Sequence, residues 1–323
     1  MSERFTSYEA TYLLPIRASD SSQARELAAY VNGIPCHDVL VVDASPPQLF
    51  ALHAKLFADH VRHIAPAGKP DTLNGKAHGV VTGMSLAQYN RVIIADDDVR
   101  YDAASLGAVL TALRTADVIR PQNYFDPCPW HAVLDSARML INRSLDGDWP
   151  GTLAVRRSAL PHGYNTAVLF ENYELVRTVC ARGGREYIAR NLFVRRLPPT
   201  SAHYWSQRIR QAYDEFARPA RLILALAIAP LCAWSAIRHR LEIPTAVLLG
   251  AMALAAAGWL REGAYKFISP LAILAAPVWL AERSVCAWLA LYERARYGGV
   301  RYAGSILRAA ASTRAERNAK WAA

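Results

Sequence analysis

Residues 222–292 are mostly apolar with few charges, whereas residues 1–219 have the mixed composition of a soluble α/β protein. This division is the strongest constraint on the fold, because a long apolar region needs either a membrane or a large buried core. Three candidate membrane helices lie within it: Leu222–Ile237, Ile243–Leu260 and Phe267–Ala281, the last with an extension to Tyr292 as an alternative. A straight spanning helix needs about 20 residues, so buried helices of a soluble domain are the other interpretation. The scarcity of polar residues inside the segments, and tryptophans near their ends, favour the membrane.

The charge of the chain is concentrated at its end. The formal net charge of the chain is +10. Residues 293–323 contain seven Lys or Arg and two Glu, so this segment carries a net charge of +5, half of the total. A basic segment directly after apolar spans indicates an anionic membrane surface rather than nucleic acid. We expect a basic helix around Ser305–Lys320. The positive-inside rule places this tail on the same side as the N-terminal domain, which favours an even number of crossings over three.

Cysteine usage and the N-terminus indicate a reducing compartment. The five cysteines are odd in number and form no CxxC motif, so neither a disulfide framework nor a zinc site is expected. The first ten residues, MSERFTSYEA, show no apolar signal-peptide region. We therefore expect the N-terminal domain to stay on the cytoplasmic side. His53, His60 and His63 have helical spacing, but no acid or cysteine nearby in the sequence completes a metal site, so they are interpreted as surface residues.

Strand and helix patterns alternate through the N-terminal part. We predict strands at Ala10–Ile16, Val39–Val42, Arg91–Ala95 and Asp117–Arg120, and helices at Ser21–Val31, Gly75–Ala87 and Asp102–Arg114. This β-α-β order predicts an α/β fold with a mostly parallel sheet covered on both faces. Ligands of such sheets bind beyond the carboxyl ends of the strands, where Asp43 and Asp96–Asp98 fall.

Asp96-Asp97-Asp98 is the sharpest local signal for chemistry. Residues i and i+2 point the same way where a strand leaves the sheet, so Asp96 and Asp98 are expected to converge. Two close carboxylates repel each other unless a cation lies between them. A hard divalent ion, Mg²⁺ or Mn²⁺, prefers oxygen ligands and commonly also holds phosphate oxygens. A solvated acidic turn is the alternative.

Several segments together resemble family 2 glycosyltransferases. The matching segments, in the order of the family, are LVVDAS at 40–45, NGKA at 74–77, ADDD at 95–98, GTLAVRR at 151–157, ENYEL at 171–175 and QRIRQ at 207–211. The last resembles the Q-x-x-R-W motif of membrane-bound members, including ceramide glucosyltransferase-like enzymes. The chain departs from the family pattern at Asn172, where a second acid is usual, and at Gln211, where a tryptophan is usual.

The resemblance implies a GT-A fold, a Rossmann-like domain that takes a nucleotide-sugar donor, here expected to be UDP-linked. It implies that Asp43 contacts the uracil or ribose with Pro15 and Arg17 bordering that pocket. By the same resemblance Lys76 helps to hold the nucleotide, Asp96 lies near the ribose and the metal, Asp98 ligates the metal, Glu171 is the general base, and Gln207 and Arg210 face the diphosphate. Glu174, three residues after Glu171, is the competing candidate for the base.

Two further segments have predicted roles. His203–Arg218 shows the apolar stripe of a helix that lies in a membrane interface, and a helix packed on the soluble core is the alternative. Residues 120–131 are rich in Pro, aromatic and amide side chains and are predicted to be a loop, either bordering an acceptor site or covering a buried Trp130.

The expected organisation has four parts: a GT-A domain at 1–200, an interfacial helix at 201–219, two or three spans at 220–292 and a basic tail at 293–323. The predicted function is inverting sugar transfer from a nucleotide-sugar to a lipid or lipid-linked acceptor at the cytoplasmic face of the plasma membrane. Alternatives are a polyprenyl-phosphate sugar synthase, a short polysaccharide synthase, and a non-enzymatic scaffold that binds nucleotide sugar or lipid. Nucleic acid is not an expected partner.

Overall fold

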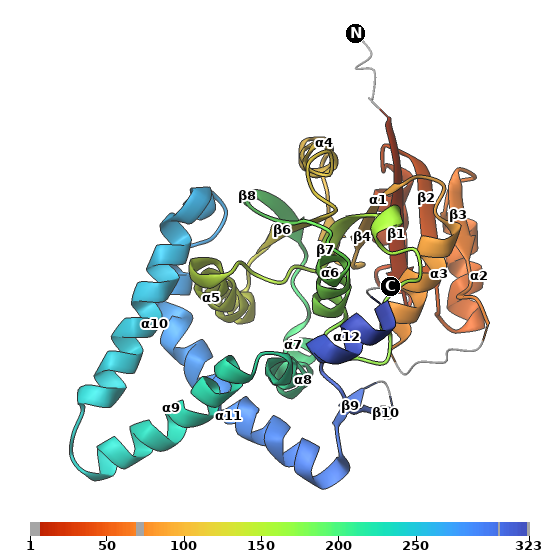
Figure 1. Ribbon diagram of the computed structural model, residues 1–323. Helices are drawn as coiled ribbons and strands as arrows, with labels where there is room; N and C mark the ends of the chain where they lie inside the picture. The colour runs from red at the N-terminus through yellow and green to blue at the C-terminus, as the bar shows by residue number, and fades with distance from the viewer. Residues whose placement is uncertain (1–6, 69–73, 303, 322–323) are drawn as a thin grey trace.

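The computed structural model of the protein describes residues 7–68, 74–302 and 304–321 (Figure 1). Its N-terminal part is built around one eight-stranded sheet with the order β3-β2-β1-β4-β7-β6-β8-β5. The strands are β1 Tyr8–Ile16, β2 Cys36–Asp43, β3 Val61–Ile64, β4 Arg91–Ala95, β5 Val99–Arg100, β6 Val118–Phe125, β7 Thr152–Arg156 and β8 Glu186–Arg196. Four of its seven pairings are parallel, including the three that join β3, β2, β1 and β4, so the predicted α/β sheet is present but mixed.

Helices cover both faces of this sheet. The first eight are α1 Ala24–Asn32, α2 Pro47–Leu56, α3 Gly75–Leu86, α4 Ala103–Ala112, α5 Trp130–Leu145, α6 Glu171–Ala181, α7 Ser201–Ser206 and α8 Arg208–Tyr213. Leu27 of α1 and Leu106 of α4 belong to one buried cluster, whereas Val80 of α3 and Val179 of α6 belong to the other. The strands supply apolar side chains to both clusters, one on each face of the sheet. This is why the predicted strands appear as continuous apolar runs.

The prediction of a loop at 120–131 is wrong. Residues up to Phe125 continue β6, which pairs in parallel with β8, and Trp130 begins α5 with 60% of its surface exposed. Pro121 lies at the register shift between Arg120 and Gln122, where a strand tolerates the missing amide donor. The proline therefore interrupts the pairing locally and does not end the strand.

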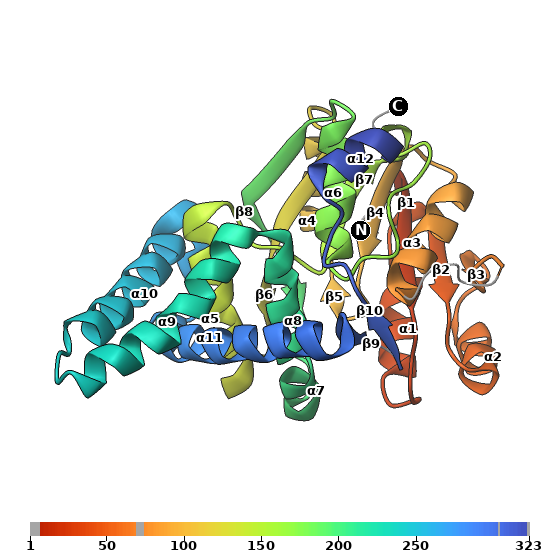
Figure 2. The ribbon, with the colours of Figure 1, turned by 60° about the horizontal axis from the view of Figure 1, so that its bottom comes forward.

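Three long apolar helices follow the sheet domain: α9 Pro219–Ile237, α10 Glu242–Leu260 and α11 Leu271–Tyr297. Each is long and apolar enough to cross a membrane. Figure 2 shows α9 and α10 as a hairpin that extends from the sheet domain, with α11 running back beneath it. The hairpin is anchored at α5, where the Arg143 guanidinium donates to the carbonyl oxygens of Gly258 and Arg261.

The segment 201–219 is not the single helix that its pattern predicts. It forms α7, α8 and a short 3₁₀ turn at Asp214–Ala217, and the chain turns at Gln207. The predicted interfacial stripe packs mainly against protein, because Ala212 and Tyr213 are fully buried beside Cys286 and Ala290 of α11. α8 therefore packs on α11 and the tail, whereas Trp205 of the same stripe is exposed; the position of the segment at a membrane interface stays a prediction.

The basic tail also differs from its prediction. Instead of one helix at Ser305–Lys320, it forms a hairpin of β9 Val300–Tyr302 and β10 Ser305–Leu307, then α12 Arg314–Trp321. The amides of Leu169 and Phe170 donate to Ala309 and Ala310 in the tail. The tail thus lies on the sheet domain, as Figure 1 shows for α12 beside α6.

The anchoring of α10 gives a direct test of this packing. A methyl group at Gly258 would overlap the Leu140 carbonyl oxygen of α5, whereas a methyl group at Gly250 of the same helix meets nothing within 4 Å. We expect Gly258→Ala to lower the free energy of unfolding by about 1–3 kcal/mol, and Gly250→Ala to leave it unchanged or raise it slightly. Thermal unfolding in detergent would measure both. Equal melting temperatures for the two variants would contradict this packing.

Candidate active site

Lys76 is the centre of the candidate site. It lies in the first turn of α3, which Asn74 caps by accepting a hydrogen bond from the Ala77 amide. The Lys76 ammonium lies 2.5 Å from Asp96 at the end of β4 and 2.5 Å from Glu171 at the start of α6. Burial alone would lower the pKa of Lys76, but the carboxylates of Asp96 and Glu171 outweigh it and raise that pKa. One charged lysine therefore joins three separate elements at the rim of the sheet.

Asp98 and Asp96 converge, as the strand-end geometry predicts, and both face Arg196 at the end of β8. The Arg196 Nε donates to Asp98 Oδ2 at 2.9 Å, and its Nη2 lies 3.7 Å from Asp96 Oδ2. Asp98 Oδ1 is buried without a hydrogen-bond partner in the described residues. Burial raises the pKa of Asp98, and the nearby Arg196 opposes this.

These carboxylates fit a divalent cation. Asp98 Oδ1 is a buried acceptor without a donor, and oxygen atoms of this kind are the ligands that Mg²⁺ and Mn²⁺ prefer. The space beside Asp96 is open because residue 151 is glycine: a Cβ atom there would lie 2.7 Å from Asp96 Oδ2. Asp96 and Asp98 are thus placed to hold a metal ion, with Arg196 supplying positive charge between them in this structure.

Lys76, Asp96 and Glu171 line a hollow of about 220 Å³, which we call the Lys76 hollow. Arg196 and Arg210 also line it, and the Arg210 guanidinium lies over the ring of Tyr302, 5.1 Å from its centroid. Gln207 does not line this hollow but lines an adjoining one, to which Arg210 also belongs. The structure therefore brings four of the predicted residues together and places Gln207 next to them.

Glu171 and Glu174 have different surroundings. Glu171 faces the Lys76 hollow, and its Oε2 is buried without a partner among the described residues. Burial raises the pKa of Glu171, which Lys76 partly offsets. Glu174, one turn further along α6, is fully buried and accepts hydrogen bonds from Arg317 and the Ser312 amide, each at 2.8 Å. Glu174 therefore holds the tail, whereas Glu171 lines the hollow.

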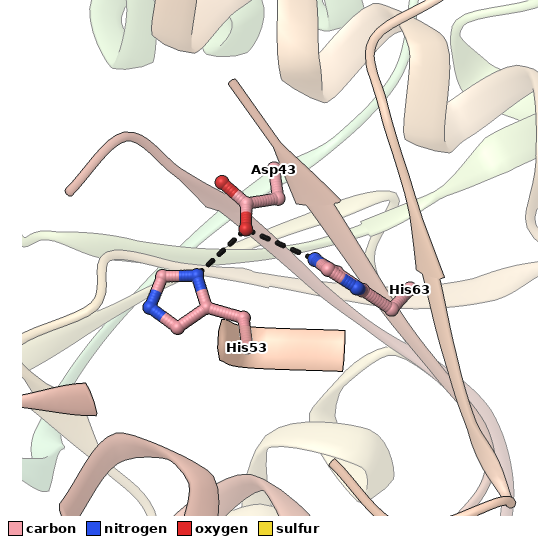
Figure 3. Close-up of side chains that lie close together, drawn as sticks. All are labelled: Asp43, His53 and His63. Carbon is pink, nitrogen blue, oxygen red and sulfur yellow. Dashed lines mark hydrogen bonds and ion pairs between the residues drawn. The ribbon is translucent and has the colours of Figure 1, made fainter. Parts of the chain in front are cut away.

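Asp43 lies apart from the Lys76 hollow. Its Oδ2 accepts hydrogen bonds from His53 Nδ1 at 2.7 Å and His63 Nε2 at 2.9 Å, and its Oδ1 accepts from the Ser45 amide (Figure 3). The aspartate is only 1% exposed. Burial would raise the pKa of Asp43, but the hydrogen bonds from His63, Ser45 and His53 lower it to about 2.

The interpretation of the histidines as surface residues is wrong for His53, which is 1% exposed, and for His63, which is partly buried. Sequence reasoning missed the acid because Asp43 comes from the neighbouring strand β2 and is distant in the sequence. The three ligand-type atoms lie within 4.8 Å of one another. The two nitrogen–oxygen separations are nevertheless those of direct hydrogen bonds, shorter than the roughly 3.3 Å between neighbouring ligands of a tetrahedral zinc ion.

The remaining predicted nucleotide contacts lie near β1. Pro15 is buried beside α3, where a Cβ atom on Gly79 would lie 3.0 Å from the Pro15 Cβ, and Arg17 is exposed. Neither lines the Lys76 hollow. Sequence reasoning missed Arg196; the available signal was the paired Arg195-Arg196 at the end of a strand pattern, since parallel neighbours end at the same rim.

Comparison with known proteins identifies the fold. No family model matches the chain, and no curated protein matches its sequence. Among solved structures, a mannosyltransferase from Pyrobaculum calidifontis in complex with GDP-Man and Mn²⁺ is similar over 89% of this chain and 88% of its own, with 18% identity and a TM-score of 0.50. The chain therefore has the α/β fold of a GT-A glycosyltransferase, followed by apolar helices.

Two other solved structures are less similar. Mannosyl-3-phosphoglycerate synthase from Rubrobacter xylanophilus has 15% identity, a TM-score of 0.42 and coverage of 62% of this chain and 71% of its own. Glucosyl-3-phosphoglycerate synthase from Mycobacterium tuberculosis, in complex with Mg²⁺ and UDP, has 14% identity, a TM-score of 0.38 and coverage of 58% and 69%.

The Asp43 cluster predicts a pH-dependent contribution to stability. The pKa of the Asp43 carboxyl is about 2 in the folded protein and about 3.9 in the unfolded chain. The ionised carboxylate therefore stabilises the fold above about pH 4, and this contribution is lost as the pH falls toward 2. We expect Asp43→Asn to lower the melting temperature at pH 7 and to do so less at pH 3, while Asp59→Asn, at an exposed position, changes neither. A loss that is the same at both pH values would contradict this assignment.

Proposed function

We propose that the protein transfers a sugar from a nucleotide diphosphate donor to an acceptor. The observation that carries this proposal is the Lys76 hollow, whose lining combines the cations Lys76, Arg196 and Arg210 with the carboxylates of Asp96 and Glu171. Asp98 lines the adjoining hollow and is joined to this site through its ion pair with Arg196. The fold is that of a mannosyltransferase with a nucleotide sugar and Mn²⁺ in its structure, which is consistent with such a donor. A UDP-linked sugar remains our proposed donor, on the resemblance of the sequence motifs.

In this proposal the cationic residues hold the leaving diphosphate. A divalent ion held by Asp96 and Asp98 would neutralise the charge that develops on the diphosphate. Arg210 faces the same hollow and would bind the diphosphate oxygens. Arg196 would give up part of its contact with Asp98, whose unpartnered Oδ1 shows that Arg196 does not satisfy this carboxylate.

Glu171 is our proposed general base. Its Oε2 accepts the proton of the acceptor hydroxyl, the hydroxyl oxygen bonds to the anomeric carbon, and the bond from that carbon to the diphosphate breaks. Lys76 holds the other oxygen of Glu171, so the carboxylate is fixed for attack from one side. Attack opposite to the leaving group inverts the anomeric configuration, and a positioned base contributes roughly 10²–10⁴-fold to the rate.

The acceptor is proposed to be a lipid or a lipid-linked molecule at the cytoplasmic face of the plasma membrane. The support is the position of the site: Arg210 lies on α8, and α8 packs directly on α11, one of the three apolar helices. A non-enzymatic scaffold is the second candidate, which Asn172 favours because it replaces the usual second acid.

Two substitutions separate these candidates. We expect Glu171→Gln to abolish transfer, by at least about 10²-fold, while Mn²⁺-dependent UDP binding survives. We expect Asp98→Asn to weaken that nucleotide binding itself, because a metal ligand is lost. Calorimetric UDP titration and transfer of radiolabelled sugar to total lipid extract measure the two effects.

Asp97→Asn is the matched control for both, since Asp97 is adjacent to Asp98 but lines neither the Lys76 hollow nor the hollow beside it. Turnover of Glu171→Gln at the parent rate would remove Glu171 from the mechanism. Mn²⁺-dependent UDP binding without transfer in the parent protein, with every lipid fraction and nucleotide sugar offered, would support the scaffold.

The structure also bears on membrane topology. The tail hydrogen-bonds to the sheet domain, so the two share one side of any membrane that the helices enter. Of the three apolar helices, α11 is the most buried within the protein. Ala272 and Ala276 of α11 pack in one buried cluster with Ala137 of α5 and Phe193 of β8, and Glu282, near the middle of α11, pairs with Arg208 of α8 at 2.6 Å. We therefore propose that α9 and α10 cross as a hairpin and that α11 does not.

Labelling with a membrane-impermeant maleimide tests this topology. Cys128 is exposed on the sheet domain and serves as the internal reference. We expect Arg314→Cys to react from the same side as Cys128, and Arg240→Cys, in the turn between α9 and α10, to react only from the opposite side. Reaction of Arg314→Cys from the side opposite to Cys128 would contradict the proposal.

A further inference from the structure

A second hollow of about 210 Å³ adjoins the Lys76 hollow on the side of the apolar helices. We call it the arginine hollow. The two share Arg196, Arg210 and Asp214. The arginine hollow is also lined by four arginines that the proposed mechanism does not use: Arg138, which pairs with Asp135 and Asp148, and Arg218, Arg221 and Arg283.

Arg283 is the most unusual of these cations. It lies near the middle of α11 and is only 3% exposed. Within the described residues no ion pair is found for it, and its Nε and Nη1 atoms have no hydrogen-bond partner; the guanidinium packs over the ring of Trp279 at 5.5 Å. Glu215 and Glu282 act on its charge from nearby without pairing with it, and a buried charge that is not directly paired is costly. The structure therefore provides a cationic donor for an anion.

The neighbouring arginines are only partly compensated. Glu215 pairs with both Arg218 and Arg221, at 3.0 and 3.4 Å, so one carboxylate serves two guanidinium groups. Arg218 Nε and Nη1 and Arg221 Nη1 are buried without a partner in the part of the chain that the structure describes.

The other acids of the arginine hollow do not remove this excess. Asp98 is bound by Arg196, and Asp135 is bound by Arg138 and Arg208. Asp214 remains, with a buried Oδ1 that has no partner among the described residues; Arg210 acts most strongly on its carboxylate, and Arg218 and Arg283 act on it more weakly. Donor atoms without acceptors therefore collect at the α9 and α11 side of the hollow.

A third hollow continues from this point between the apolar helices. It has a volume of about 250 Å³ and shares Glu215, Arg221, Trp279 and Arg283 with the arginine hollow. The rest of its lining is mostly aliphatic, with Leu224 and Ile228 of α9 and Leu254 of α10. A polar site, a cationic site and an apolar site thus follow one another from the sheet to the helices.

We infer that the arginine hollow binds the phosphate of an amphiphilic acceptor whose hydrocarbon chain lies between α9, α10 and α11. Phosphate oxygens match the forked donors of arginine, and lipid chains match the aliphatic lining. The inference rests on the proposed function and narrows its acceptor to phosphate-bearing lipids. Arg221 and Arg283 would contact the phosphate where it joins the hydrocarbon chain. Arg210 would face the end of the acceptor that carries the reacting hydroxyl group.

Binding of radiolabelled dodecyl phosphate to the full chain in neutral detergent micelles tests the inference without turnover. Unlabelled dodecyl phosphate should displace the label, whereas dodecanol and inorganic phosphate should each displace it at least about tenfold less well. Arg283→Gln should weaken binding about tenfold or more, since a charge-assisted hydrogen bond contributes roughly 1.5–3 kcal/mol. Arg296→Gln, at an exposed position of the same helix, should leave it unchanged.

The outcomes divide clearly. Equal competition by dodecanol would overturn the phosphate site, and equal competition by inorganic phosphate would overturn the lipid. These arms use the parent protein, so they hold even where a variant misfolds; Arg221→Gln is the second variant. Unchanged binding in folded Arg283→Gln would also overturn the inference. Mn²⁺-dependent UDP binding, measured on the same samples, reports the proposed donor site separately.

Discussion

The site depends on the pairing of buried carboxylates with cations at the rim of the sheet. Asp96 and Asp98 lie in the turn between β4 and β5, and Glu171 begins α6. The mutual repulsion of these carboxylates would open the site without compensation. Lys76 and Arg196 provide that compensation through contacts of 2.5 and 2.9 Å. Among the described residues, Asp98 Oδ1 and Glu171 Oε2 are buried carboxylate oxygens of these three acids that have no hydrogen-bond partner, and these are the atoms to which we assign the metal and the acceptor proton. The same electrostatics therefore organise the fold locally and leave the reactive atoms available.

The sequence predicted those parts of the molecule that local rules determine. Strand β4 was found at its observed bounds, Arg91–Ala95, because a buried strand is a continuous apolar run that ends in acids. Asp96 and Asp98 converge for the same local reason. The three apolar helices were also identified, and all five cysteines are free. The sequence did not predict features that depend on contacts between distant segments. Strand β6 continues through Pro121 because it pairs with β8, and His53 is buried where it hydrogen-bonds to the Asp43 carboxylate.

In the C-terminal third, an amphipathic or basic sequence pattern does not determine which surface the segment packs against. The stripe of α8 and the basic tail each fit a membrane surface by composition, yet both pack on the protein. Arg317 illustrates the reason, since its charge neutralises the buried Glu174. Arg283 is the opposite case, because among the described residues no acid forms an ion pair with it and two of its guanidinium nitrogens have no hydrogen-bond partner. The hollows that adjoin it connect the candidate active site with the apolar helices.

The most direct test is a structure of the protein soaked with Mn²⁺ and UDP, in which the anomalous signal of manganese locates the ion. The account predicts a peak within about 2–2.3 Å of a carboxylate oxygen of Asp98, with the diphosphate on its other side facing Arg210. A manganese ion bound instead among Asp43, His53 and His63, or UDP bound away from Lys76, would contradict it.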